Sequence, residues 1–152
     1  MESLERILRA HRFLAGIDKA FSGLIIGCAK NVRFEAGQYL FHEGDDADAF
    51  YLIREGRIAI EVAIPGRGAI TFLTLGEGEI VGVSWPIPPY RWMFDARAVV
   101  LTRAIGIDAA CLRTKCDADH HLGYEMMKRF LPVIVKRLQA TRLQILDVYG
   151  KN

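Results

Sequence analysis

The stretch that decides the fold runs from Phe34 to Ile60 and reads FEAGQYLFHEGDDADAFYLIREGRIAI. Short runs of branched and aromatic residues alternate in it with polar turns that contain Gly37, Gly44 and Gly56. Such runs between glycine-bearing turns are typical of β-strands, and glycine adopts the positive φ of a tight turn at little cost. We therefore expect these glycines to specify the fold and not to contact a ligand.

The same pattern continues along the chain and predicts about eight strands. They are expected at residues 32–34, 39–41, 49–53, 57–64, 69–75, 79–81, 96–100 and 103–107. Pro65-Gly66 lies between two of these runs and predicts a hairpin loop. Short strands at regular spacing are typical of an antiparallel jelly roll (a double-stranded β-helix), which can hold one small ligand in its mouth.

Helical patterns lie on both sides of the predicted strands. Apolar side chains recur at helical spacing in residues 3–15, and a shorter apolar stretch at residues 21–28 predicts a second helix. After the strands, Asp108 is expected to cap a short helix that ends near Lys115. We therefore expect a single domain of the α+β class, mainly β. Its parts are N-terminal helices in residues 1–30, the jelly roll in 31–108 and C-terminal helices in 109–152.

A long helix is expected to begin at a cap formed by Asp117 or Asp119 and to end near Tyr149. Pro132 lies inside it and is expected to kink it or to separate two helices. About thirty helical residues span about 45 Å, which is longer than a jelly roll of this size can cover.

The apolar surface of this helix needs a partner. Monomers rarely expose large apolar patches, so a second copy of the chain is the simplest partner and a homodimer is expected. The alternative is a helix that folds back on its own jelly roll. The residues expected at the contact between two copies are Met127, Phe130, Ile134, Leu138 and Ile145.

Composition and cysteine usage limit the function classes. The net charge of +2 gives no whole-molecule argument for nucleic-acid binding. The charged N-terminus lacks the apolar core of a signal peptide, and the apolar run at residues 21–29 is too short to span a membrane. Cys28, Cys111 and Cys116 form an odd set without metal spacing, so we expect small buried side chains, no disulfide and a cytoplasmic protein.

The chain resembles a cyclic-nucleotide-binding domain in two respects. One is the order of its predicted elements: helices, jelly roll and long helix. The other is the pattern F-x-x-G-x-x-L-F-x-E-G followed by D-x-F-Y-L-I-x-x-G-x-I. The matching positions are Phe34, Gly37, Leu40, Phe41, Glu43, Gly44, Asp48, Phe50, Tyr51, Leu52, Ile53, Gly56 and Ile58. The resemblance extends over nearly the whole chain, through LGEGEIVG and ARAVVLTRAIGID. It implies a non-enzymatic regulatory module without a required cofactor. Such a module binds cyclic AMP, cyclic GMP or a related small anion and signals through its C-terminal helix.

The family's phosphate-binding segment corresponds to GEIVGVSWPIPPYRWMFDARA, residues 78–98. In the family, backbone N–H groups and an Arg hold the cyclic phosphate, and a Glu directly after a glycine holds the ribose hydroxyl. Gly82 matches that glycine, but Val83 stands at the Glu position, and Ser84 is only a weak acceptor. The phosphate-binding Arg corresponds to Arg91 or Trp92, depending on where the loop is one residue shorter.

Two interpretations of this segment remain open from the residues alone. In the first, the segment binds a small anion, with Trp85 or Trp92 stacked on a base. The ligand-binding residues implied by the resemblance are Gly82, Val83, Ser84, Trp85, Arg91, Trp92 and Arg97. In the second, the aromatic and proline residues fill or cover the pocket and Arg91 pairs with Asp95. The protein is then a dimerisation or protein-interaction scaffold.

Other chemistry finds little support in the sequence. No nucleophile and base are arranged for catalysis, and the clustered His and Glu ligands of metal-dependent cupin enzymes are missing, so neither a catalytic residue nor a metal site is expected. His120 and His121 lie beside acids at a helix start, where capping explains them. Related catabolite-activator proteins carry a helix-turn-helix after the long helix. The chain ends before such a motif, so we expect an effector protein as partner and no direct DNA or membrane binding.

Overall fold

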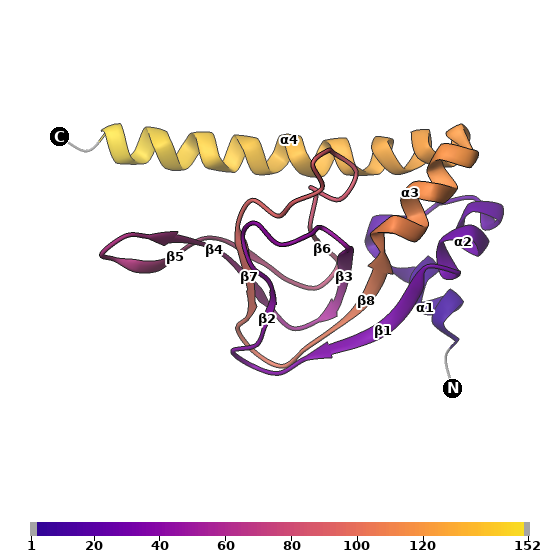
Figure 1. The fold of residues 1–152 in the computed structure, drawn as a ribbon, viewed down its shortest axis with the longest axis horizontal. Coiled ribbons are helices and arrows are strands. Elements are labelled where there is room, and N and C mark those ends of the chain that lie inside the picture. The colour runs from indigo at the N-terminus through magenta and orange to yellow at the C-terminus, as the bar shows by residue number, and fades with distance from the viewer. Residues whose placement is uncertain (1–2, 151–152) are drawn as a thin grey trace.

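The computed structural model describes residues 3–150 as a jelly roll of two four-stranded antiparallel sheets with helices at both ends of the chain (Figure 1). One sheet has the order β1-β8-β3-β6 and the other has the order β2-β7-β4-β5. The strands are β1 (Ala29–Phe34), β2 (Tyr39–Phe41), β3 (Ala49–Glu55), β4 (Ile58–Ile64), β5 (Gly68–Leu75), β6 (Ile80–Val81), β7 (Asp95–Ala98) and β8 (Thr102–Asp108). This arrangement confirms the predicted fold class.

The core lies between the two sheets and continues under the helices. Alternation along the strands directs one set of side chains inward. The largest side chains that are fully buried include Trp85, Phe50, Phe130, Leu52, Ile53, Ile58, Ile60, Leu75 and Ile80. The stretch that predicted the fold supplies β2, β3 and the first three residues of β4.

The N-terminal region differs from the single helix expected over residues 3–15. It forms α1 (Leu4–Ala10) and the 3₁₀ helix η1 (Arg12–Leu14), and α2 (Lys19–Ile26) follows. The division falls at His11, whose backbone is extended and whose Nδ1 accepts a hydrogen bond from the Phe13 N–H at 3.2 Å. A side chain that caps the next turn in this way favours the end of one helix and the start of another.

The C-terminal region contains α3 (Ala109–Ala118) and α4 (His120–Gly150). Asp108 caps α3 by accepting a hydrogen bond from the Cys111 N–H at 2.9 Å, as predicted. The cap of α4 is Asp119 and not Asp117, because Asp119 accepts from the N–H groups of His121 and Leu122. α4 continues as one helix through Pro132, so of the two alternatives expected there, a kink or a junction between two helices, the junction is wrong.

Two of the three cysteines form a disulfide, which corrects the expectation that all three are unpaired. Cys28, between α2 and β1, is bonded to Cys111 on α3 with their Cα atoms 5.7 Å apart. Cys116 is free. Sequence spacing gave no indication of this pairing because the fold brings together two residues that are 83 positions apart.

α4 runs the length of the molecule and extends beside the β4–β5 hairpin (Figure 1). A hydrogen bond of 2.8 Å from the Gln144 side chain to the Phe72 carbonyl joins the outer part of α4 to β5. Within residues 3–150, none of the helices is both long enough and apolar enough to cross a membrane.

Candidate functional site

The loop between β6 and β7, residues 82–94, contains most of the residues expected to bind a ligand. It rises from the jelly roll toward α4 (Figure 1). Two backbone hydrogen bonds shape its tip, from the Ile87 N–H to the Ser84 carbonyl and from the Tyr90 N–H to the Ile87 carbonyl. A further contact from α3 fixes it, because the Arg113 guanidinium donates to the Trp85 carbonyl at 2.7 Å and lies 4.2 Å from the Tyr90 ring centroid.

The Trp92 ring lies directly over Gly82. Gly82 has a φ of 107°, and a Cβ added to it would lie 2.5 Å from the Cη2 atom of Trp92. The indole stacks on Phe41 with ring centroids 3.9 Å apart and is only 2% exposed. The space above Gly82 is therefore occupied by a side chain of the same loop.

Trp85 is also part of the core. Its ring is 1% exposed, stacks on Phe50 at 4.8 Å and meets Phe130 of α4 edge-on at 5.4 Å. Its Nε1–H has no hydrogen-bond partner among residues 3–150. Trp85 thus connects the loop to both the jelly roll and α4.

Val83 and Ser84 offer little to a sugar hydroxyl. Val83 is half-buried against the core and has no acceptor atom. Ser84 is buried, and its carbonyl accepts from Ile87 in the turn described above.

Arg91 faces outward and is paired. Its guanidinium forms an ion pair of 3.0 Å with Asp46 and donates to the Gly44 carbonyl at 3.2 Å, and its side chain is 55% exposed. The expected partner, Asp95, is not the one observed. The Asp95 carboxylate instead accepts from the Glu43 N–H at 2.7 Å and lies 3.6 Å from His42 Nδ1.

Arg97 lies on the outer face of β7, because it alternates with the buried Ala96 and Ala98. Its guanidinium binds both carboxylate oxygens of Glu61, with distances of 3.2 Å from Nε to Oε1 and 3.1 Å from Nη2 to Oε2. Hydrogen bonds with Glu61 raise the pKa of Arg97. Arg97 is therefore directed away from the space at Gly82.

The sequence reasoning missed Glu61, the buried partner of Arg97. Its side chain is 4% exposed although it is ionisable, and Tyr39 lies beside it and Arg97. Burial and the neighbouring Glu61 carboxylate raise the pKa of Tyr39. The indication in the sequence was one acid inside the apolar run IAIEVAI, because a buried carboxylate needs a cationic partner.

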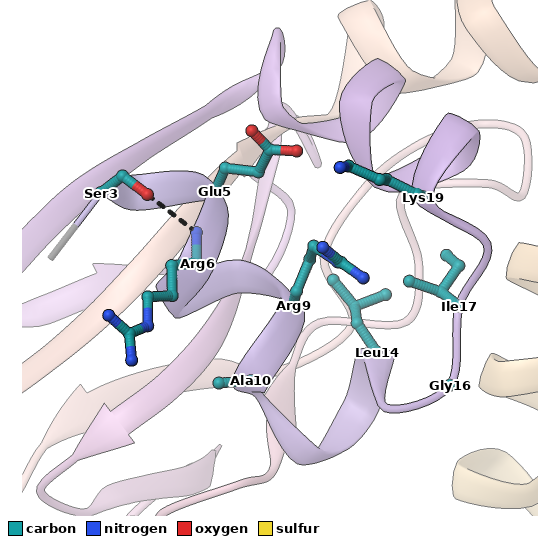
Figure 2. Close-up of a pocket in the computed structure, with 9 residues that line it drawn as sticks. All are labelled: Ser3, Glu5, Arg6, Arg9, Ala10, Leu14, Gly16, Ile17 and Lys19. Carbon is teal, nitrogen blue, oxygen red and sulfur yellow. Dashed lines mark hydrogen bonds between the residues drawn. The ribbon is translucent and has the colours of Figure 1, made fainter.

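Surface hollows lie elsewhere. One of about 540 Å³ is lined by α1, η1 and the start of α2. Figure 2 shows two of its basic side chains, Arg9 and Lys19, near Leu14 and Ile17, whereas the third, Arg6, points away from them. None of the predicted ligand-binding residues lines it. A smaller hollow of about 260 Å³ lies between the loop and the start of α4, and Trp85 is the one predicted ligand-binding residue that lines it.

The five residues expected at a helix contact differ in exposure along α4. Phe130 is buried and meets Phe13 at 4.9 Å, so it belongs to the chain's own core. Met127 and Ile134 are half-buried. Leu138 and Ile145 are exposed, at 67% and 52%. The first half of α4 thus covers the jelly roll, while the second half presents apolar side chains to solvent.

Residues 3–150 contain no group of three or more His, Cys, Asp or Glu side chains that could hold a metal ion. The arrangement around Gly82 is an aromatic cluster of Trp85, Trp92, Phe41 and Phe50. These rings pack against one another, and the cluster presents no free charged group to a ligand.

Comparison with known proteins identifies what this chain is similar to. The model of the family described as cyclic nucleotide-binding domain matches residues 31–119. A CRP-like cAMP-activated global transcriptional regulator of Mycobacterium tuberculosis is 23% identical over 145 residues, which cover 95% of this chain and 63% of that protein. A solved structure from Geobacter metallireducens GS-15, named as a cyclic nucleotide-binding protein, is 28% identical with a TM-score of 0.79 and coverage of 91% and 99%.

A match to an enzyme is confined to a small part of it. The lysophospholipase nte1 of Neosartorya fischeri is 37% identical over 51 residues, which are 34% of this chain and 3% of that protein. The chain thus spans less than two thirds of both the regulator and the lysophospholipase.

Proposed function

Since the chain belongs to the cyclic nucleotide-binding domain family, we propose that it is a non-enzymatic regulatory module whose own Trp92 fills the family's ligand pocket and which acts through its C-terminal helix. The fold is that of a regulatory ligand-binding module. The observation that carries the proposal is the Trp92 ring, which lies within contact distance of Gly82 and stacks on Phe41.

The remaining groups of the loop support the same conclusion. A cyclic nucleotide needs an acceptor for its ribose hydroxyl and a guanidinium for its phosphate. Val83 provides no acceptor, and Arg91 and Arg97 are already paired with Asp46 and Glu61. A nucleotide would therefore have to break an ion pair and replace an indole.

The cost of moving that indole decides between the two interpretations. A buried aromatic side chain removes about 150–250 Å² from water, which is worth about 4–6 kcal/mol at 25 cal/mol per Å². Returning Trp92 to solvent would weaken nucleotide binding by about a thousandfold or more. A micromolar site would become a millimolar one.

The alternative is a receptor for cyclic AMP, cyclic GMP or a related anion in which Trp92 swings out of the pocket. The family match and the regulator named as cAMP-activated favour it. Such a receptor would use the loop at Gly82 to move α3 and then α4.

Homodimer formation through α4 is part of the proposal. From Leu131 onward the helix exposes a series of large apolar side chains: Leu131, Val135, Leu138, Leu143, Ile145, Leu146, Val148 and Tyr149. Burial of such a surface is the usual reason for association. A separate effector protein is the other candidate for this surface.

Calorimetric titration with cyclic AMP and cyclic GMP tests the filled pocket. We expect no saturable heat with the wild-type protein at submillimolar nucleotide. A double variant, Val83→Glu with Trp92→Arg, restores the two groups that the family uses, and we expect measurable binding from it if thermal melting shows that it folds. Micromolar binding by the wild-type protein would contradict the proposal and support the receptor.

A further inference from the structure

A groove lies between α4 and the edge formed by β5 and the turn before β6. It has a volume of about 460 Å³ and is lined along one side by α4. Its apolar wall consists of Phe13, Leu73, Leu75, Ile80, Val133 and Ala140. We call it the α4 groove. Its volume and largely apolar lining are those of a pocket for a small organic ligand.

The charged side chains that line the α4 groove are mostly basic. Arg12, Lys136 and Arg137 line it together with one acid, Glu79. The Glu79 carboxylate already accepts a hydrogen bond from the Gly76 N–H at 2.7 Å. The groove therefore has an excess of positive charge that its own acid does not neutralise.

Arg137 is the central cation of the α4 groove. Its Nη2 donates to the Ile80 carbonyl, and this is the one hydrogen bond that its guanidinium makes to the residues that the structure describes. A guanidinium carries five N–H donors, so donors remain for an anion. Burial lowers the pKa of Arg137. A half-buried guanidinium gains more from an anionic acceptor than an exposed one does.

We propose that the α4 groove binds a small organic anion, with its carboxylate or phosphate head at Arg137 and Lys136 and its apolar body against the half-buried Leu73 and Val133. Arg12 also lines the groove, and its guanidinium lies over Gly78 and donates to the Glu77 carbonyl at 3.4 Å.

The position of the α4 groove gives the ligand a role. Ile80 and Val81 form β6, which leads directly to Gly82, while Val133 and Ala140 belong to α4. A ligand in the groove would join α4 to the strand that precedes the loop. It would therefore stabilise the position of α4 without entering the space that Trp92 occupies. The inference goes beyond the filled pocket and does not depend on it.

Titration with decanoate and decyl phosphate tests the proposal, followed by calorimetry and by amide chemical shifts. We expect saturable binding of at least one of these anions, with shifts at Gly78, Lys136 and Ala140, and no such binding of decyltrimethylammonium, which has the same chain and the opposite charge. The tighter anion identifies the head group. Shifts confined to Gly82 and Trp92 would place the ligand in the jelly-roll pocket and would overturn the proposal.

Variants locate the head group. Loss of one charge-assisted contact weakens binding by about tenfold or more, so Arg137→Gln is expected to have that effect and Lys136→Gln a smaller one in the same direction. Arg142→Gln, on an exposed turn of the same helix, is expected to bind as the wild type does. If Arg137→Gln does not melt cooperatively and is therefore not folded, the binding affinity of Lys136→Gln tests the proposal instead. Equal binding by Lys136→Gln and wild type, or equal binding of the decyl cation, would overturn the proposal.

Discussion

Gly82 is the residue on which the arrangement of the loop depends. Its missing side chain lets the Trp92 ring lie against the backbone, and its φ of 107° is one that other residues rarely adopt. The sequence marked Gly82 as the family's glycine but left Arg91 and Trp92 as alternatives for the phosphate position. Which of them lies over Gly82 depends on the path of a loop with three prolines, and no residue pattern determines that path.

Replacing Gly82 by Ala tests the contact with Trp92. The positive φ alone costs about 1–2 kcal/mol, and overpacking against the ring adds about 1–3 kcal/mol to the loss of unfolding free energy. Gly16→Ala is the matched control, because Gly16 also has a positive φ but nothing lies within 4 Å of an added Cβ. Urea denaturation measures both. Equal losses for the two variants would show that the ring does not press on Gly82.

The folding stability of the protein is expected to depend on pH through His11. Its Nε2–H donates to the Ile53 carbonyl at 2.8 Å while its Nδ1 accepts from Phe13, so the folded protein requires the neutral ring. Burial is the main cause that lowers the pKa of His11, and Arg12 lowers it further. Since the folded pKa lies below the unfolded value of about 6.5, the stabilisation is present above that pH and is lost as the pH falls through the folded pKa.

The expected result is a fall in the urea midpoint below about pH 6.5 that His11→Gln reduces. His42→Gln, at an exposed position, serves as the control. An unchanged pH profile in His11→Gln would show that His11 is not the titrating group. Residue spacing could not predict this contact, because the carbonyl that His11 meets belongs to a strand 42 residues away.

Among the elements, the strands were the most predictable. Residues 39–41 were predicted with the bounds of β2, and the other strands differ from their predictions by a few residues at their ends. Alternation and turn residues are local properties, so the chain itself carries them. The α3 cap at Asp108 is local in the same sense. The Cys28–Cys111 and Arg97–Glu61 pairs join distant elements and could not be read from spacing.

The disulfide fixes α3 to the junction of α2 and β1. In the chain-entropy view, closing 83 residues of separation stabilises the fold by up to about 4.5 kcal/mol, so Cys28→Ser with Cys111→Ser is expected to lose a large part of that. Urea denaturation measures this loss of unfolding free energy, with Cys116→Ser as the control for the double variant. Burial raises the pKa of Cys116 to about 11, so its thiol stays protonated at neutral pH and does not exchange with the bond.

Unchanged stability of the double variant would contradict this account. Disulfides persist mainly in oxidising compartments, so the cytoplasmic location remains a prediction. A count of free thiols in protein taken directly from cells would test it. With alkylation carried out on cells lysed in denaturant, one alkylated cysteine indicates that the bond forms there, and three indicate that it does not.

At the scale of the whole molecule, α4 determines what the protein presents to others. Its length and its excess of apolar side chains were visible in the sequence. The sequence did not show which of those side chains the jelly roll covers, because the covered set depends on where α4 crosses the sheets. Phe130 proved to be a core residue, whereas Leu138 and Ile145 are exposed.

Sedimentation equilibrium tests self-association. The wild-type protein is expected to sediment with twice the mass of one chain, and Leu138→Asp with the mass of one, because a buried charge disfavours the contact. Gln139→Asp, on the neighbouring exposed position, has the same helix propensity cost and should stay dimeric. A monomeric wild-type protein would leave the exposed half of α4 to an effector.

The filled pocket is the central claim, and collisional quenching of Trp92 tests it most directly. The chain has two tryptophans, so Trp85→Phe leaves Trp92 as the one emitter. We expect acrylamide to quench it slowly, as for a buried indole, and cyclic AMP to leave the emission unchanged. Quenching as fast as in the urea-unfolded chain, or a saturable change with cyclic AMP, would contradict the account.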